Sequence, residues 1–399
     1  MTRREQNIRL FGWIAVVAAK LVVVVGFHVW SLNVGHRGLA PIVIGGDDGI
    51  EYLYVAERIA QTGSTSRAVS NVWAIWVGQL MGVFGVQGTF LFKLILFSTS
   101  LGTAVVGVKL LRRLAADLYR SRPTATAEIT TAAALLLFPS TLWITSYSIY
   151  RDGVLYFLSM VAVYTAYLLL IRKQKVAAVW LGLTLALLFP LRWYATVSVV
   201  GGVLVWMLVS GRGPRERWQR RALAVVLAGV GVLVVARTGQ LYLLDQALTS
   251  RDLFDYNQGG SNLGLSYSRS SVVLWPVIYL YTFVTNLIGP LPNQIEGVTT
   301  IMGFVLEVPL LLYVLVRLWR SPATRRPEAL LLVAVAAVWL LLLPIYNDNI
   351  GTGLRLRVLG YQFLFVLCAL DVSARRMPRA RARHRQRLTA NRAAFQPTH

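Results

Sequence analysis

The stretch Ile44-Gly45-Gly46-Asp47-Asp48-Gly49-Ile50-Glu51-Tyr52-Leu53-Tyr54 lies just beyond the first long apolar run of the chain. It carries three carboxylates, Asp47, Asp48 and Glu51, in a chain with only 17 acidic residues. Two glycines followed by two aspartates disfavour a buried helix, but the residues after Gly49 follow the spacing of an amphipathic helix. One aspartate suffices to cap that helix. The remaining carboxylates therefore point to chemistry.

The composition places the chain in a membrane. Of its 399 residues, 56% are hydrophobic and 14% are charged, whereas soluble domains carry about 25% charged residues. Apolar runs of about 16–24 residues recur between charged stretches, which is typical of a polytopic protein. Cys368 stands alone in an apolar run, so a disulfide framework and a cysteine metal site are excluded. We expect an all-α polytopic membrane protein.

The formal net charge of +23 is arranged in a way that argues against nucleic acid as a partner. Lysines and arginines gather in clusters that recur after every second apolar run, as the positive-inside rule requires of cytoplasmic loops. The clusters fall at 3–9, 109–122, 172–175, 212–221, 317–326 and from Arg375 onward. Membrane lipids are therefore the expected partners of this charge.

Placing these clusters in the cytoplasm gives about ten spans with both termini inside. They are expected at 10–32, 88–111, 127–147, 153–171, 176–190, 195–210, 222–236, 299–318, 328–345 and 358–372.

Two further apolar stretches lie at 71–86 and 272–288. If either crossed the membrane, the basic cluster that follows it would fall outside the cell, so we expect both stretches to be interfacial or re-entrant. The result is one membrane domain over 1–372, located in the cell membrane, with external loops at 33–87 and 238–298. The basic segment 373–399 is expected to be a disordered cytoplasmic tail.

Four arginines fall on the outer face, against the positive-inside tendency: Arg151, Arg192, Arg355 and Arg357. Guanidinium groups at a membrane edge suit a phosphate or diphosphate, which they bind through paired hydrogen bonds. The alternative for each is contact with lipid headgroups or pairing with a neighbouring acid. As a set, they favour a phosphate-bearing ligand.

The predicted site combines these arginines with the outer carboxylates. Asp47 or Asp48 is expected to be the catalytic base that deprotonates an acceptor hydroxyl. Asp152 is expected to orient the acceptor or the base. The three carboxylates could also hold Mg²⁺ or Mn²⁺, although no motif demands a metal.

The expected substrate-binding set comprises the outer arginines and neighbouring polar side chains of the first loop and the turns: Glu51, Tyr52, Arg151, Arg192, Tyr194, Arg355 and Arg357.

The first half of the chain, over residues 10–210, resembles the GT-C superfamily of polyprenyl-phosphate-dependent glycosyltransferases. Its members include the protein O-mannosyltransferases and the lipid A aminoarabinose transferases. Gly46-Asp47-Asp48-Gly49 with Tyr52 stands where that family keeps a first-loop acidic motif. Trp76-Val77-Gly78-Gln79-Leu80-Met81-Gly82-Val83-Phe84-Gly85 is similar to its juxtamembrane helix, and Tyr150-Arg151-Asp152-Gly153 occupies the place of its second external aspartate. The paired prolines usual before the juxtamembrane helix are missing.

The resemblance implies transfer of a sugar from a polyprenyl-phosphate-linked donor to a glycan, lipid or protein acceptor on the outer face. The second half is similar to membrane proteins of polysaccharide clusters, which leaves open a polymerase or ligase acting on a polyprenyl-diphosphate-linked glycan. A flippase or transporter for lipid-linked glycan is a further alternative. It predicts charges inside spans along a path, and the candidates are Lys20, Lys93 and Glu307.

Overall fold

The computed structural model describes residues 3–39, 48–63, 72–85, 88–211, 214–237, 263–265, 267, 270–295 and 297–394. Over these residues the chain is helical and has no β-strand, which confirms the all-α fold class. The α-helices are α1 (Arg3–Asn33), α2 (Asp48–Thr62), α3 (Val72–Phe84), α4 (Phe90–Tyr119), α5 (Ala125–Leu137), α6 (Pro139–Tyr147), α7 (Asp152–Leu170), α8 (Ala177–Leu191), α9 (Trp193–Val209), α10 (Pro214–Arg237), α12 (Trp275–Ile288), α13 (Val298–Met302), α14 (Val308–Trp319), α15 (Pro327–Tyr346) and α16 (Ile350–Ala394). Short 3₁₀ helices occupy η1 (Val272–Leu274), η2 (Pro292–Gln294) and η4 (Pro322–Arg325), and η3 (Gly303–Glu307) is a π-helix.

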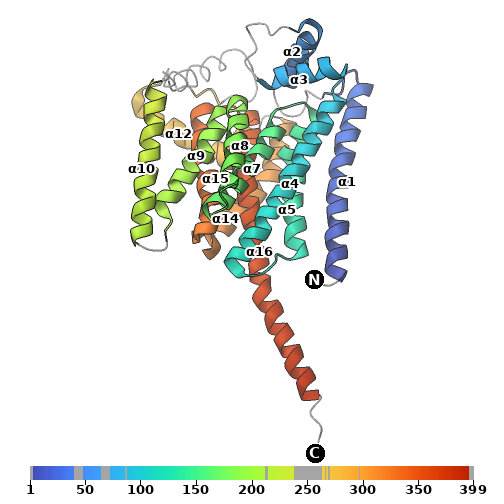
Figure 1. Cartoon of the computed structure of the whole chain (residues 1–399). Helices are drawn as coiled ribbons and strands as arrows, with labels where there is room; N and C mark the ends of the chain where they lie inside the picture. Colours follow the sequence, from blue (N-terminus) through green and yellow to red (C-terminus); the bar gives the residue numbers. More distant parts are fainter. Residues whose placement is uncertain are drawn as a thin grey trace, which may run out of the picture.

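Six helices of the described chain are long and apolar enough to cross a membrane: Arg3–Asn33, Phe90–Tyr119, Asp152–Leu170, Thr300–Trp319, Pro327–Tyr346 and Ile350–Arg375. Helices α5 and α6, which are bent by 49°, make a seventh candidate when taken as one span. The chain is therefore a multi-pass membrane protein. Helices α8 and α9 stand in the same bundle (Figure 1) but have only 15 and 17 residues. The count of about ten spans accordingly stays a prediction.

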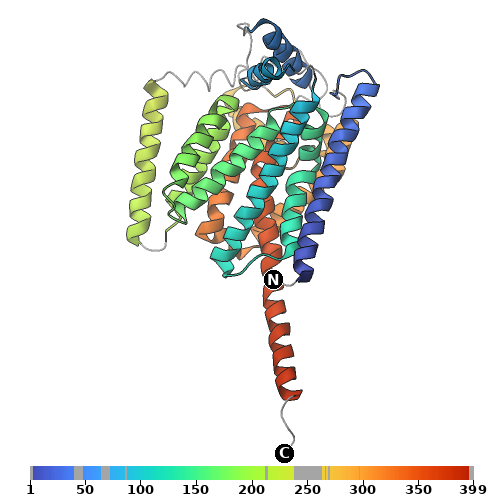
Figure 2. The same cartoon turned by 45° about the vertical axis from the view of Figure 1, so that its right-hand side comes forward.

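The two ends of the bundle differ in structure. Helices α2 and α3 lie across one end, above the spans (Figure 1), as the interfacial interpretation of 71–86 predicted. Helix α1 begins at the opposite end, where α16 also leaves the bundle (Figure 1 and Figure 2). The C-terminal region differs from the expectation of a disordered tail, because α16 continues as a helix to Ala394. Its many alanines and arginines are good helix formers and favour this helix, whereas Pro378 opposes it.

Helix α16 is the centre of the bundle and α1 lies at its edge. In the most apolar 18-residue stretch of α16, 94% of the residues are buried. In the corresponding stretch of α1, 17% are buried. A helix that is apolar all round and buried belongs in the core of a bundle, and one that is exposed there faces lipid. The C-terminal Arg355 and Arg357 are thus carried into the middle of the fold.

The bend between α5 and α6 is stabilised by a buried carboxylate. Pro139 begins α6 and has no N–H to continue the helical ladder. The backbone N–H and the hydroxyl of Ser140 both donate to Oε1 of Glu307, at 2.5 and 2.6 Å. The carbonyl of Leu136 accepts a bond of 3.2 Å from Nζ of Lys20. Lys20 and Glu307, two of the three charges expected inside spans, therefore have hydrogen-bond partners within the fold.

Arg357 completes this buried network. It forms an ion pair with Glu307, in which both side chains are almost inaccessible to solvent, and it also donates to the carbonyl of Gly289. Glu307 ends the π-helix η3, whose wider turn interrupts the α-helical ladder. A buried charge that lost this partner would be costly, so the pair is a structural tie between η3 and α16.

Candidate functional site

The turn between α6 and α7, residues 148–151, receives both helices that lie across the end of the bundle. Gly49, in the first turn of α2, packs so closely on Ser148 that a Cβ at this position would lie 1.6 Å from its Oγ and 3.0 Å from its Cβ. Nε1 of Trp73, in α3, donates to the carbonyl of Ile149 at 2.7 Å. Only glycine allows the start of α2 to approach this closely. The start of α2 is therefore anchored beside the turn that leads into Asp152.

Asp152 and Arg192 face each other within this region. Asp152 begins α7 and Arg192 occupies the turn between α8 and α9. Their nearest charged atoms, Oδ1 and Nη1, are 3.7 Å apart, although both side chains are nearly buried. This separation is too long for a hydrogen bond. Oδ1 of Asp152, and Nε and Nη1 of Arg192, have no hydrogen-bond partner within the described chain. Unsatisfied buried polar atoms are costly unless a ligand supplies their partners.

Arg151 lies in the same electrostatic environment. Its Nη1 donates to the carbonyl of Leu191 at 3.0 Å, which ties the α6–α7 turn to the α8–α9 turn. Burial lowers the pKa of the Arg151 guanidinium from its ordinary value, as does the positive charge of Arg192. Tyr52 and Asp152 act in the opposite direction. The structure thus brings residues of α2, α7 and the α8–α9 turn together.

Arg355 joins the cluster from α16. Its guanidinium lies over the ring of Tyr150, with Cζ 4.6 Å from the ring centroid, which is a cation–π contact. The hydroxyl of Tyr156 donates to the backbone carbonyl of Arg355 at 2.6 Å. Tyr150 and Tyr156 were absent from the sequence-based set. Tyr156 follows Asp152 by four residues on a helix, so the two share one face, and that spacing is a signal by which it could have been found.

Aromatic rings form one wall of the site. Tyr194 is stacked between Tyr346, at 4.7 Å between centroids, and Trp339, at 5.4 Å. The guanidinium of Arg192 lies 5.3 Å from the ring of Tyr194. Trp193 meets Tyr346 edge-on at 5.4 Å. Stacked rings hold Tyr194 in one orientation and support Arg192 above it.

Two predicted residues stand apart from this cluster. Arg357 belongs to the buried pair with Glu307, because residues two apart on a helix point about 200° away from each other and Arg355 faces the cluster. Glu51 is exposed on α2, whereas Tyr52, the next residue, is half-buried.

Of the two first-loop aspartates that the sequence predicts to be catalytic, the structure describes only the backbone of Asp48. Asp47 lies outside the described residues, and of Asp48 the structure describes the backbone, as the first residue of α2. Among the described side chains, no group of three or more His, Cys, Asp or Glu is placed to hold a metal ion. The roles of Asp47, Asp48 and Asp152, and a metal bound by them, stay predictions.

Comparison with known proteins identifies the fold. The sequence matches no protein-family model and no curated protein. Two solved structures are similar, both of ArnT from Cupriavidus metallidurans, a GT-C glycosyltransferase. The form bound to undecaprenyl phosphate aligns with a TM-score of 0.52 at 16% identity, and the apo form with a TM-score of 0.47. Each alignment covers 90% of this chain and 60% of ArnT, so the chain spans less than two thirds of the length of ArnT. The chain therefore has a GT-C-like fold.

Proposed function

We propose that the protein is a membrane glycosyltransferase that moves a sugar from a polyprenyl-phosphate-linked donor to an acceptor outside the cell. The observation that carries this proposal is the convergence of Asp152, Arg192 and Arg355 beside the start of α2, at the end of the bundle opposite the termini. A phosphate at the membrane surface would supply the hydrogen-bond acceptors that Nε and Nη1 of Arg192 lack within the described chain, since a guanidinium group binds two phosphate oxygens at once. Undecaprenyl phosphate is the ligand of the similar ArnT structure.

The proposed chemistry gives each of these groups a role. The acceptor hydroxyl attacks the anomeric carbon of the donor sugar, and the bond from that carbon to the phosphate oxygen breaks. Asp47 or Asp48 takes the hydroxyl proton, while the electron pair of the broken bond leaves on the phosphate. Arg192 and Arg355 stabilise the charge that develops there. Asp152 holds the acceptor in position opposite the donor.

A divalent cation is a further element of this proposal. Asp47, Asp48 and Asp152 offer the hard oxygen ligands that Mg²⁺ or Mn²⁺ prefers. The docking of Gly49 on Ser148 supports this proposal, because it brings the start of α2 beside the turn that precedes α7. A bound cation would neutralise phosphate charge at this place, and the protein residues would then act as ligands or as the base.

The test replaces the first-loop carboxylates one at a time, by Asp47→Asn and Asp48→Asn. In cells that express each variant at the wild-type level, we expect the variant that lacks the catalytic base to be about 10²–10⁴-fold less active than the wild type. The surface glycan should disappear and its lipid-linked precursor should accumulate on the outer leaflet. Glu57→Gln is the control, because it makes the same chemical change on α2 in an exposed ion pair with Arg37.

The alternatives predict different outcomes of the same experiment. Normal glycan from both variants would contradict a first-loop base and favour a polymerase that depends on the arginines. Precursor held on the inner leaflet would indicate a flippase. The structure gives the flippase little support, because Lys20 and Glu307 have fixed partners in the fold. Of the three charges, only Lys93 has a buried Nζ without a hydrogen-bond partner among the described residues.

A further inference from the structure

An open cavity lined by many charged side chains lies at the other end of the bundle, between α1, α4 and α5. Its volume is about 950 Å³. Five cations and one carboxylate line it: Arg9, Lys109, Arg112, Arg113, Arg122 and Glu128. Helix α1 begins at this end of the molecule, opposite the end where α2 and α3 lie (Figure 1). Nothing in the proposed transfer reaction uses this cavity.

Helix geometry brings the cations to one place. Lys109, Arg112 and Arg113 follow the spacing i, i+3 and i+4, which puts them on one face of α4. Arg9 faces them from α1, and Arg122 comes from the connection between α4 and α5. The sequence places these residues in two separate basic clusters, and the fold joins the clusters across a single cavity.

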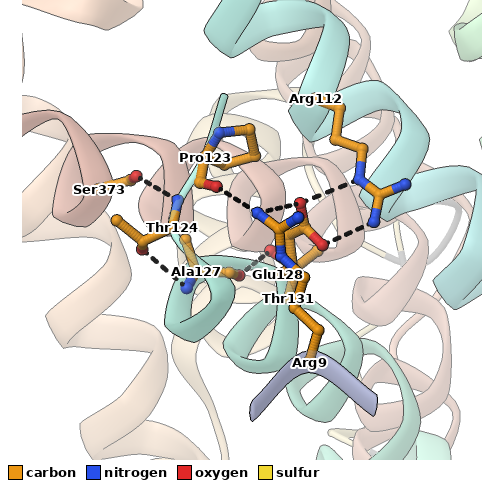
Figure 3. Close-up of polar contacts among 8 residues, drawn as sticks. All are labelled: Arg9, Arg112, Pro123, Thr124, Ala127, Glu128, Thr131 and Ser373. Carbon is orange, nitrogen blue, oxygen red and sulfur yellow. Dashed lines mark hydrogen bonds and ion pairs between the residues drawn. The ribbon is translucent and has the colours of Figure 1, made fainter. Parts of the chain in front are cut away.

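Glu128 organises two of the arginines. It is only 1% exposed and accepts two bonds from Arg112, Nε to Oε1 at 2.9 Å and Nη2 to Oε2 at 2.7 Å. Nη2 of Arg9 lies 3.4 Å from Oε1 of Glu128 and donates to the carbonyl of Pro123 at 3.0 Å (Figure 3). Helix α5 is held in turn by the bond from the N–H of Thr124 to Ser373 (Figure 3). The two guanidinium groups are thus fixed before any ligand arrives.

Positive charge remains in excess after these bonds are counted. One carboxylate faces five cations, and Lys109, Arg113 and Arg122 are exposed to the cavity and its opening. The positive-inside rule accounts for positive charge on this side of the membrane, but it does not require that the charges converge on one cavity. Convergence is what an anionic ligand requires.

The same cavity has an apolar side toward the middle of the membrane. Leu10 and Trp13, on α1, line it. One turn further into the bundle, Ile14 on α1 and Val105 on α4 are exposed, at 53% and 38%. Val105 precedes Lys109 by four residues and so lies on the same helix face. A cavity that is cationic at the end of the bundle and apolar toward its middle fits an amphiphilic molecule with an anionic headgroup.

We infer that this cavity binds an anionic glycerophospholipid. The phosphate would lie among Lys109, Arg113 and Arg122, with Arg9 and Arg112 behind it, and an acyl chain would follow the apolar seam between α1 and α4. Basic pockets between transmembrane helices are suited to such headgroups. The site is distinct from the proposed donor site and lies in the opposite half of the molecule.

The test is native mass spectrometry of the full chain with phosphatidylglycerol or phosphatidylcholine. The variant Lys109→Gln/Arg113→Gln/Arg122→Gln leaves the Arg9–Glu128–Arg112 contacts in place. We expect it to weaken phosphatidylglycerol binding about 10-fold or more and to leave the weak binding of phosphatidylcholine unchanged. The matched control Lys175→Gln/Arg320→Gln/Arg325→Gln removes the same charge from exposed residues outside the cavity. It should change binding by less than about 2-fold.

Several results would overturn the inference. One is that the triple variant binds phosphatidylglycerol as tightly as the wild type does. Another is that the matched control loses as much affinity for phosphatidylglycerol as the triple variant. Displacement of the lipid by equal concentrations of soluble glycerol 3-phosphate would assign the cavity to a soluble phosphate. If the triple variant unfolds at a lower temperature than the wild type, the single variant Arg113→Gln decides, with an expected loss of about 3-fold.

Discussion

At the scale of single residues, Glu307 and Arg357 show what the sequence does and does not reveal. The sequence marks Glu307 as a charge inside an apolar run, but its partner could not be predicted. Arg357 was assigned to the outer edge together with Arg355, two residues before it. On a helix these side chains point about 200° apart, so only one of them can face the site. Tertiary packing of α16 decides which one does.

The Glu307→Gln variant tests the buried pair. The change leaves the Arg357 guanidinium buried without its counter-charge, and we expect a loss of about 3 kcal/mol in the free energy of unfolding. Unfolding in mixed detergent micelles measures it. Adding Arg357→Gln to this variant should restore part of the stability, because the unpaired charge is then removed. A single variant as stable as the wild type would contradict the assigned ion pair.

At the scale of elements, the apolar periodicity predicted most of the helices. The amphipathic pattern after Gly49 corresponds to α2, and the stretch 71–86 corresponds to α3. The sequence could not predict that both helices dock on the α6–α7 turn, because this docking depends on contacts with residues about 75–100 positions away. The bend between α5 and α6 was likewise missed, since it depends on Glu307 from a distant helix.

The Gly49→Leu variant tests the docking of α2. The Ser148 hydroxyl can rotate away from a new Cβ, but its own Cβ and the backbone of Ile149 leave no room for a leucine. We expect α2 to shift from the turn and activity to fall about 100-fold, because misplaced groups lose their alignment. The lipid-linked precursor assay in cells measures this loss.

The control for that experiment is Gly26→Leu in α1, where an added Cβ meets no other part of the described chain within 4 Å. It should retain wild-type activity. Equal losses from both substitutions would mean that the docking of α2 has no special role.

At the scale of the whole molecule, charge distribution in the sequence predicted that the termini and the acidic loop lie on opposite sides. The structure has α2 and α3 at one end and the start of α1 at the other (Figure 2). The sequence could not show which outer residues meet, since Tyr156 and Arg355 are 199 positions apart. The cationic cavity was missed for the same reason, because its two basic clusters lie on different helices.

Thiol labelling checks the sidedness. In a Cys368→Ala background, the exposed positions Glu5 and Gln61 are replaced by cysteine, one at each end of the bundle. A membrane-impermeant maleimide should label Gln61→Cys in intact cells and Glu5→Cys only after permeabilisation, because positive clusters stay inside. Labelling of Glu5→Cys in intact cells would reverse the orientation.

The most direct measurement of the central claim is the affinity of the purified protein for undecaprenyl phosphate in lipid nanodiscs. It is made in the Lys109→Gln/Arg113→Gln/Arg122→Gln background, so that the cationic cavity does not contribute. Arg192→Gln should weaken binding about 10-fold or more, since it removes a charge-assisted contact to the phosphate. Arg58→Gln, which removes an exposed charge from α2, should not weaken it. Equal affinities for the Arg192→Gln and Arg58→Gln proteins would contradict the claim that the Asp152–Arg192–Arg355 cluster holds a polyprenyl phosphate.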